Sequence, residues 1–198
     1  MKAWQVTSLG APADALELVE LADPTPGPGQ LLVRVGAAAP SYPDLLMCRG
    51  EYQIKPPLPF TLGVEAAGTI EAVGPDVHGW APGQRVLGML ETGGLAELAL
   101  FEAAQAFAAP AELDDAEAAA LHMNYQTAHF ALHRRAGLRR GETVLVHAGA
   151  GGVGSATIQL AVAAGAPVVA VVGGPEKAEV ATRLGAELAV DRHAADFV

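Results

Sequence analysis

A glycine-rich loop contains the residues whose types and spacing are best suited to chemistry. Gly149, Gly151 and Gly154 form a Gly-x-Gly-x-x-Gly pattern directly after the apolar segment at 143–146. In such a pattern the first glycine permits a tight turn, the second allows the backbone to approach a pyrophosphate, and the third allows close packing of helix and strand. A helix that begins here presents free N–H groups and a favourable dipole to phosphate oxygens. The loop therefore predicts a nucleotide site.

The elements expected around this loop support that interpretation. A helical pattern that includes Ile158 and Leu160 follows the loop, and then come a strand at 167–172, a helix at about 176–184 and a strand at 188–190. This β-α-β-α-β order is typical of half of a dinucleotide-binding fold. The candidate loop residues for binding the cofactor are Gly149, Ala150, Gly151, Gly152, Val153 and Gly154. The alternative is a glycine-rich turn in an unrelated α/β protein.

The choice of dinucleotide depends on the residues about 20 positions after the loop, where NAD-specific folds place an acid on the ribose 2′-hydroxyl. Residues 172–175 contain no carboxylate, whereas Lys177 follows at once and Arg192 lies after the third strand. Glu176 and Glu179 fall beyond the usual position of the acid. We therefore expect NADPH, although both cations could instead be solvated surface charges, which is the usual situation for Lys and Arg.

Composition excludes several classes of partner. The net charge of the 198 residues is −10, which argues against nucleic acid and anionic membranes. The sequence has no apolar run of membrane-spanning length, and the N-terminus shows no signal-peptide pattern. A single cysteine, Cys48, excludes an internal disulfide and a cysteine-rich zinc lobe. These features predict a cytoplasmic protein with a small-molecule substrate.

The chain divides into a β-rich part and an α/β part. Strands are expected at 16–21, 30–35, 66–73 and 84–89, with another at 93–99. Such short segments, separated by Gly or Pro, are typical of a barrel or sandwich. Helices are then expected at 114–120 and 124–135. We place a first domain at residues 1–115 and a second at 116–198.

The second domain contains fewer strands than a whole dinucleotide-binding domain. A complete domain has about six strands, and the pattern here ends after the third. We expect either a fragment or a partner that supplies the remainder. An unpaired edge of the parallel sheet would invite association.

The spaced motifs of the chain resemble those of the medium-chain dehydrogenase/reductase superfamily, and in particular its zinc-free quinone oxidoreductase branch. The matching segments are Met1–Trp4, Tyr42–Leu46, Arg49–Tyr52, Pro57–Phe60, Gly63–Gly68, Gly83–Val86, Asn124–Ala128 and Gly149–Gly154. The resemblance covers the whole chain, which corresponds to about the first two-thirds of a family member.

This resemblance implies a GroES-like catalytic barrel followed by a partial Rossmann fold. It also implies NADPH, hydride transfer and a homodimer. Lys177 matches the family's basic residue for the 2′-phosphate. Arg192 departs from the tyrosine that quinone reductases often carry at this position, but it can still contact a phosphate.

The resemblance also indicates whether the chain can bind the zinc ion of its superfamily. The three usual zinc-ligand positions of the superfamily correspond to Ser41, Val64 and Met123, which are not a normal zinc-ligand set. His129 and His133 have helical i, i+4 spacing, but a solvated or core-edge helix face is by far the more usual reason for such a pair. We therefore expect no metal, and we regard a zinc alcohol dehydrogenase as the less favoured enzyme.

Without a Lewis acid, hydride transfer suits quinones and α,β-unsaturated carbonyl or enoyl substrates, which also need a proton donor. Tyr52 occupies the Gly-x-Tyr position of enoyl reductases in this superfamily, and Thr127 resembles the family threonine near the nicotinamide. Ser41 and Tyr42 are expected in the substrate pocket. Tyr52 could instead be a packing residue, and Thr127 could bond to its own helical turn. A non-catalytic relative that binds nucleotide or a partner chain stays open as an alternative.

Overall fold

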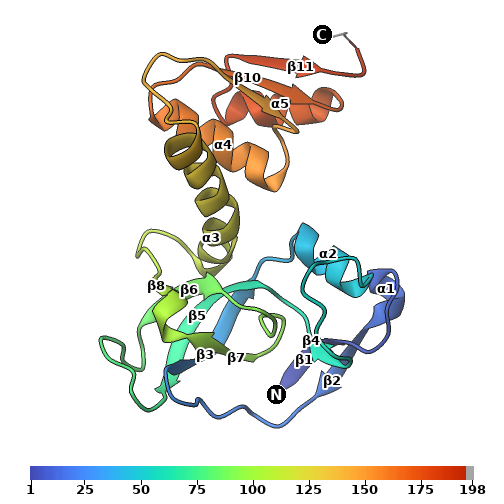
Figure 1. Cartoon of the computed structure of the whole chain (residues 1–198), viewed down its shortest axis with the longest axis vertical. Coiled ribbons are helices and arrows are strands. Elements are labelled where there is room, and N and C mark those ends of the chain that lie inside the picture. The colour runs from blue at the N-terminus through green and yellow to red at the C-terminus, as the bar shows by residue number, and fades with distance from the viewer. Residues whose placement is uncertain (195–198) are drawn as a thin grey trace. The chain divides into compact units, whose positions relative to one another are not determined.

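The computed structural model describes residues 1–194 as two compact units, the first of which is Met1–His122 and the second of which begins at Met123. The division lies inside helix α3 (Asp115–His129). Figure 1 labels most of the helices and strands of both units. The predicted domain limit at 115/116 lies at the start of this helix and stays a prediction.

The first unit is built on antiparallel sheets. The larger sheet has five strands in the order β7-β3-β5-β6-β8, and the smaller sheet has the order β2-β1-β4. The strands of the larger sheet are β3 (Gln30–Ala38), β5 (Glu65–Val73), β6 (Arg85–Met89), β7 (Leu98–Glu102) and β8 (Ala106–Ala108). Those of the smaller sheet are β1 (Lys2–Val6), β2 (Leu16–Glu20) and β4 (Phe60–Thr61).

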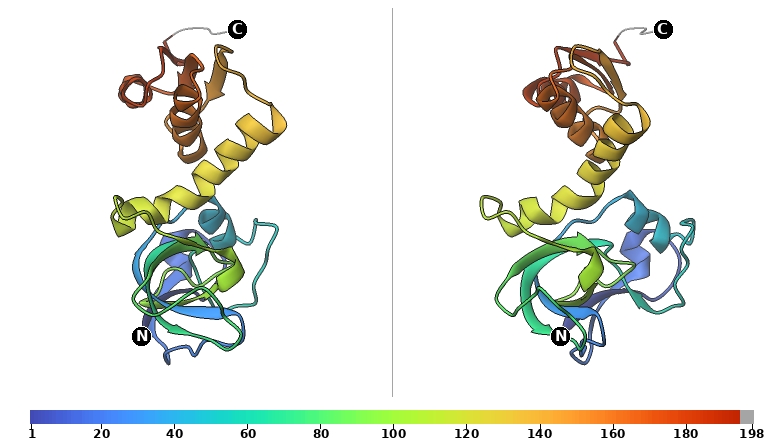
Figure 2. Two further views of the ribbon diagram at one scale, coloured as in Figure 1. Left: turned by 90° about the vertical axis from the view of Figure 1, so that its left-hand side faces the viewer. Right: turned by 60° about the vertical axis from the view of Figure 1, so that its left-hand side comes forward.

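The larger sheet is strongly curled, as the views of Figure 2 show. Irregularities in the β3–β5 register at Leu32/Val33 and Val35/Ala37 accompany this curvature. The core residues of this sheet are Leu31, Val33, Ala66, Ile70, Val86, Leu90, Ala99 and Phe101. The barrel expected from the short strands is therefore confirmed.

The helical region differs from its prediction. The separate helices expected at 114–120 and 124–135 form one continuous run, in which α3 continues as a π-helical segment, Phe130–Arg135. The prediction of two helices was wrong because Leu121, His122 and Met123 include no Gly or Pro that would interrupt a helix. No helix in the part of the chain that the structure describes is long and apolar enough to cross a membrane.

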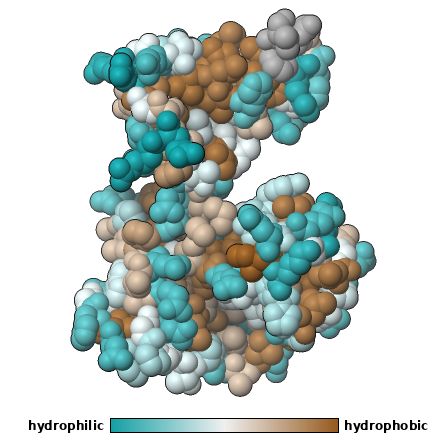
Figure 3. All heavy atoms as spheres, in the orientation of Figure 1, coloured by the Kyte–Doolittle hydropathy of each residue, from teal (hydrophilic) through white to brown (hydrophobic). Residues whose placement is uncertain are grey.

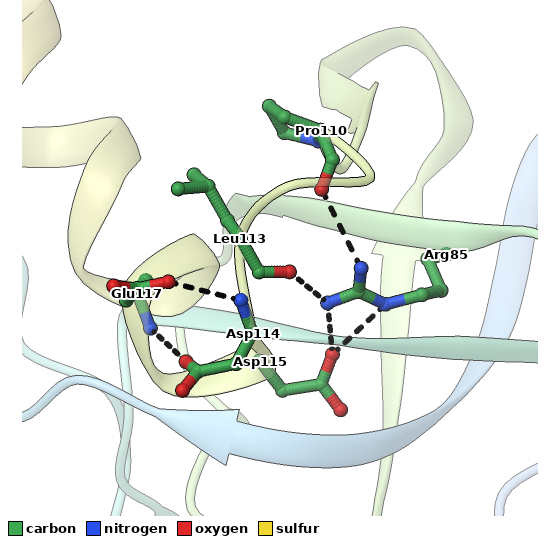
Figure 4. Close-up of polar contacts among 6 residues, drawn as sticks. All are labelled: Arg85, Pro110, Leu113, Asp114, Asp115 and Glu117. Carbon is green, nitrogen blue, oxygen red and sulfur yellow. Dashed lines mark hydrogen bonds and ion pairs between the residues drawn. The ribbon is translucent and has the colours of Figure 1, made fainter.

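A polar network fixes the start of α3 (Figure 4). Asp114 and Glu117 form a reciprocal capping pair, with each carboxylate accepting the other residue's backbone N–H at 2.8 and 3.1 Å. Arg85 of β6 donates to Asp115 Oδ1 at 2.6 and 3.1 Å and to the carbonyl oxygen of Leu113 at 2.9 Å. The first turn of the helix is therefore tied to the sheet.

Gly36 makes room for this network. A Cβ placed on Gly36 would lie 1.9 Å from Asp115 Oδ2 and 3.0 Å from Asp115 Cβ. Any side chain at position 36 would therefore displace the Asp115 carboxylate from Arg85.

The predicted strand at 93–99 was placed too early. The structure has β7 at Leu98–Glu102, whereas Gly93 has a left-handed φ of 103° and its N–H donates to the carbonyl oxygen of Thr61, far away in the chain. The sequence also gave no prediction for the short elements β4, β8, α1 (Pro12–Ala15) and α2 (Tyr42–Cys48).

The second unit contains a parallel sheet of order β11-β10-β9. Its elements are β9 (Val144–His147), α4 (Gly152–Ala163), β10 (Val168–Val172), α5 (Pro175–Arg183) and β11 (Leu188–Asp191). They confirm the predicted β-α-β-α-β order. The apolar core contains Val146, Val168, Ala170 and Val172 of the strands together with Ile158, Ala161 and Ala181 of the helices.

Alternate residues of this sheet point away from that core. Leu145, Val169 and Leu188 are register partners across the three strands, and Leu145 and Leu188 are 57% and 54% exposed. Hydrophobic atoms accordingly gather on the surface around β10 (Figure 3). Parallel sheets are normally covered on both faces, so this row is an uncommon exposed feature.

Candidate functional site

The glycine loop forms a tight turn between β9 and α4. The N–H of Gly151 donates to the carbonyl oxygen of Ala148 at 2.8 Å, and Ala148 itself has the left-handed φ of 53°. The turn therefore does not depend on backbone freedom at Gly149, as the sequence had suggested. Gly149 is required for packing instead, because a Cβ there would lie 2.8 Å from the Cβ of Ala170.

Gly154 brings the first turn of α4 against the loop. A Cβ at Gly154 would lie 2.2 Å from the carbonyl oxygen of Ala148, a backbone atom that cannot move aside cheaply. Gly151 is the N-cap residue, so the N–H groups of the first helical turn, from Gly152 onward, lie next to the loop. These amides have no intrahelical acceptor and can bind an anion.

A pocket of about 450 Å³ lies at the carboxyl ends of the three parallel strands. Its lining comes from the loop after β9, the end of β10 and the loop that follows it, the first turn of α5 and the loop after β11. The lining residues are His147, Ala148, Ala150, Gly151, Val171, Val172, Gly173, Lys177, Arg192 and His193. The carboxyl edge of a parallel sheet is where α/β folds bind ligands.

The pocket contains the two cations predicted from the sequence. Lys177 and Arg192 both line it and are exposed. His193 and His147 also line this pocket, and the sequence analysis did not predict them as site residues. The adjacency of His193 to Arg192 is a signal that could have found it, because loops after parallel strands gather at one edge.

Asp191 connects the loop after β10 with the loop after β11. Its Oδ1 accepts the N–H of Gly174 at 2.8 Å and the N–H of His193 at 3.0 Å. These hydrogen bonds, first that from His193 and then that from Gly174, hold the pKa of the Asp191 carboxyl below its usual value of 3.8. The carboxylate therefore acts as a brace between the ends of β10 and β11.

Two basic side chains lie beside Gly173, in the segment where NAD-specific folds carry an acid. Gly173 follows β10 and has no side chain, and a Cβ there would lie 3.2 Å from His193 Cε1 and 3.3 Å from Arg192 Nε. Arg192 and His193 therefore lie next to the position where an NAD-specific fold would carry its acid. The glycine turn, the amides of α4 and these side chains together suit a dinucleotide with an extra phosphate.

The proposed substrate residues of the first unit lie at the start of α2 and in the loop that follows it. Asp44 Oδ2 accepts both the N–H and the Oγ–H of Ser41, at 2.8 and 3.0 Å, in a capping box. Ser41 therefore has a structural role at the helix start. Tyr42 is 68% exposed, and Tyr52 is half-buried in the loop after α2. Their roles toward a substrate stay predictions.

Asp44 and Cys48 are among the buried residues of α2. Asp44 is 2% exposed and its Oδ1 makes no hydrogen bond, while Cys48 is fully buried. Burial raises the pKa of the Cys48 thiol, and the Asp44 carboxylate raises it further. Cys48 is therefore held as a neutral thiol.

Thr127 lies in the second unit on α3. Its Oγ1–H donates to the carbonyl oxygen of Met123 at 2.7 Å, and the residue is exposed. This is the back-bond to its own helical turn that the sequence left open. A role for Thr127 near a nicotinamide stays a prediction. Residues 1–194 contain no group of three or more His, Cys, Asp or Glu side chains placed to hold a metal ion.

Known protein families match both units of the chain. Residues 27–111 match the alcohol dehydrogenase GroES-like domain, and residues 152–198 match the family described as zinc-binding dehydrogenase. The structure also superposes on a probable oxidoreductase from Mycobacterium abscessus with a TM-score of 0.92 and 42% identity over 96% of this chain. The chain belongs to the medium-chain dehydrogenase/reductase superfamily. Within this superfamily its fold is a GroES-like barrel followed by part of a Rossmann fold.

Other relatives of this superfamily member include a quinone oxidoreductase and a synthase. The Escherichia coli quinone oxidoreductase, solved in complex with NADPH, matches all of the chain with a TM-score of 0.90 and 30% identity. An erythronolide synthase of Saccharopolyspora erythraea is 46% identical over 145 residues, which are 73% of this chain and 4% of the synthase. The chain spans 61% of the Mycobacterium abscessus protein and 60% of the Escherichia coli enzyme.

Proposed function

We propose that this chain is a zinc-independent, NADPH-dependent oxidoreductase that reduces a quinone or an α,β-unsaturated carbonyl or enoyl substrate. The observation that carries the proposal is the pocket at the end of β10, where Gly173 stands in place of an acid and Lys177 and Arg192 line the wall. Relatives named as quinone oxidoreductases, some solved with NADPH, support the same cofactor and reaction class.

The residues of the chain would divide the work between binding and proton supply. Gly149 to Gly154 and the first turn of α4 would hold the pyrophosphate, and Lys177 and Arg192 would hold the 2′-phosphate. When bound, NADPH supplies a hydride to an electron-poor carbon. The Tyr52 hydroxyl is the proposed proton donor, with Ser41 and Tyr42 shaping the substrate pocket and Thr127 near the nicotinamide.

The cofactor proposal is tested by Lys177→Ala. This change should weaken NADPH more than NADH, because NADPH alone carries the 2′-phosphate. A lost hydrogen bond to a charged group costs about 1.5–3 kcal/mol at most, and the exposure of Lys177 places the loss at about the lower limit. Fluorescence titration with both cofactors gives the two dissociation constants. Equal weakening of NADH and NADPH would contradict the role.

The reaction is tested by turnover. NADPH oxidation should be seen with 1,4-benzoquinone or with an enone and should survive treatment with a chelator. Stoichiometric zinc together with loss of activity on chelation would favour a zinc alcohol dehydrogenase. Binding of NADPH without turnover of either substrate class would favour a non-catalytic relative that binds nucleotide or a partner chain.

We further propose a homodimer with a cytoplasmic location, as the family resemblance and the composition imply. Light scattering coupled to size-exclusion chromatography measures the mass of the assembly directly. A monomeric mass at micromolar concentration would overturn the dimer. Cell fractionation tests the location.

A further inference from the structure

His193 lies in the nucleotide pocket, in a place where it can add a third positive charge. It lines the pocket with Lys177 and Arg192. A Cβ at Gly173 would lie 3.2 Å from His193 Cε1 and 3.5 Å from its Nε2. The imidazole therefore lies beside the backbone at the end of β10, where a dinucleotide-binding fold receives the ribose 2′ position.

The backbone at His193 is held in place by the brace described above. The His193 N–H donates to Asp191 Oδ1 at 3.0 Å, and the same oxygen accepts the N–H of Gly174. The loop after β11 is thus tied to the loop after β10. This connection fixes where the imidazole can reach, although the side chain itself is 63% exposed.

The charged groups around the imidazole make it a suitable phosphate ligand. His193 Nδ1 lies 4.0 Å from Asp191 Oδ1, whereas Arg192 and Lys177 contribute positive charge to the pocket and His147 is a second titratable lining residue. A phosphate dianion that entered the pocket would meet the positive charges of Lys177 and Arg192 and the imidazole of His193.

We propose that His193 is a specificity-determining residue that binds the 2′-phosphate of the nucleotide when protonated, so that preference for the phosphorylated cofactor strengthens as pH falls. The inference rests on the proposed function and deepens it. Histidine is the ordinary side chain whose charge changes between about pH 5 and pH 8. A pocket that uses a histidine for this contact is therefore expected to change its selectivity over that pH range.

The test uses two nucleotides that differ only in the group concerned. Adenosine 2′,5′-bisphosphate and adenosine 5′-monophosphate are titrated calorimetrically into the wild-type chain and into His193→Gln, at about pH 6 and about pH 8. His78→Gln is the matched control, because His78 is an exposed histidine of the first unit. The 2′-phosphate itself titrates near pH 6, and comparing the proteins at each pH cancels this contribution.

At about pH 6 the wild-type preference for the bisphosphate should exceed that of His193→Gln by about two- to fivefold, the range of an exposed ion pair. At about pH 8 the two proteins should agree, and His78→Gln should match wild type throughout. Binding of the monophosphate should be unchanged by His193→Gln, which also reports an intact fold.

Three outcomes decide the matter. An excess preference at about pH 6 that vanishes at about pH 8 supports the proposal. A wild-type preference for the bisphosphate that His193→Gln retains in full at both pH values overturns the role of His193 but leaves the NADPH assignment standing. A wild-type chain that binds the monophosphate but does not prefer the bisphosphate at either pH overturns both.

Discussion

Asp191 shows how one side chain can connect pH to the stability of the pocket. Its folded-state pKa lies below 3.8 because it accepts two backbone N–H groups. A carboxyl whose pKa is lowered by folding stabilises the protein at pH values above its unfolded pKa. That contribution is lost as the pH falls through the folded value.

Asp191→Asn should therefore destabilise the chain at neutral pH, because the charge-assisted bonds to Gly174 and His193 weaken. The difference in denaturation midpoint between wild type and variant should shrink as the pH falls below 3.8. Urea unfolding followed by circular dichroism at several pH values measures this. A difference that is constant from neutral to acidic pH would show that the carboxylate charge contributes nothing.

At this scale the sequence predicted the groups that define a site but not the contacts between them. Of the eight residues predicted to bind the cofactor, four line the pocket: Ala150, Gly151, Lys177 and Arg192. The brace at Asp191 could not be predicted, because it depends on the parallel register that puts the ends of β10 and β11 side by side. The Ser41–Asp44 capping box was visible as a Ser-x-x-Asp pattern but was interpreted as substrate chemistry instead.

At the scale of elements, the junction between β6 and α3 predicts a strong effect of a small substitution. Gly36→Ala should push the Asp115 carboxylate away from Arg85, since the added Cβ would overlap it. Overpacking of this kind costs about 1–3 kcal/mol of unfolding free energy. Equilibrium urea unfolding of the variant measures the loss.

Gly10→Ala is the control for this experiment, because a Cβ at Gly10 meets no atom within 4 Å. It should leave stability nearly unchanged. The double variant Gly36→Ala/Asp115→Ala should lose less than the sum of the two single changes, because the shortest contacts of the added Cβ are with the carboxylate that Asp115→Ala removes. Strict additivity would mean that Gly36 acts through some other contact.

Elements with a strong sequence pattern were predicted well, and elements that depend on tertiary contacts were not. The three parallel strands and their helices agree with prediction within a few residues, because apolar runs bounded by Gly and Pro mark them. Strand β4 has two residues and exists because β1 pairs with it. Such a strand has no local signal of its own.

At the scale of the whole molecule, the two units have separate cores and different spectroscopic reporters. Both tryptophans, Trp4 and Trp80, belong to the first unit, whereas the proposed nucleotide pocket belongs to the second. Tryptophan fluorescence therefore reports mainly on the first unit, while far-ultraviolet circular dichroism reports on both. The reporters can locate where a ligand stabilises the chain.

NADPH at about a hundred times its dissociation constant should add about 2.7 kcal/mol to the stability of the unit that binds it. The transition seen by circular dichroism should move to higher temperature by more than the transition seen by tryptophan fluorescence. Thermal unfolding with NADPH, and with adenosine as the control, measures both. Equal shifts would mean that the units unfold together, and a larger fluorescence shift would place binding in the first unit.

The two compact units divide between His122 and Met123, inside helix α3, whereas the domain limit predicted at 115/116 lies at the start of that helix. The predicted limit follows the change from short segments separated by Gly or Pro to helical patterning. Local sequence cannot show this division, because no Gly or Pro interrupts the helix on either side of it. The packing partners on each side, rather than a break in the chain, decide where one unit ends.

The crowding of Gly36 against Asp115 also bears on how this chain can evolve. A mutation that adds a side chain at position 36 meets the Asp115 carboxylate and the ion pair with Arg85 at once. The same mutation becomes tolerable after Asp115 has changed to a smaller residue. Substitutions at these three positions are therefore expected to occur in a preferred order along a lineage, with the loss of the carboxylate preceding the loss of the glycine.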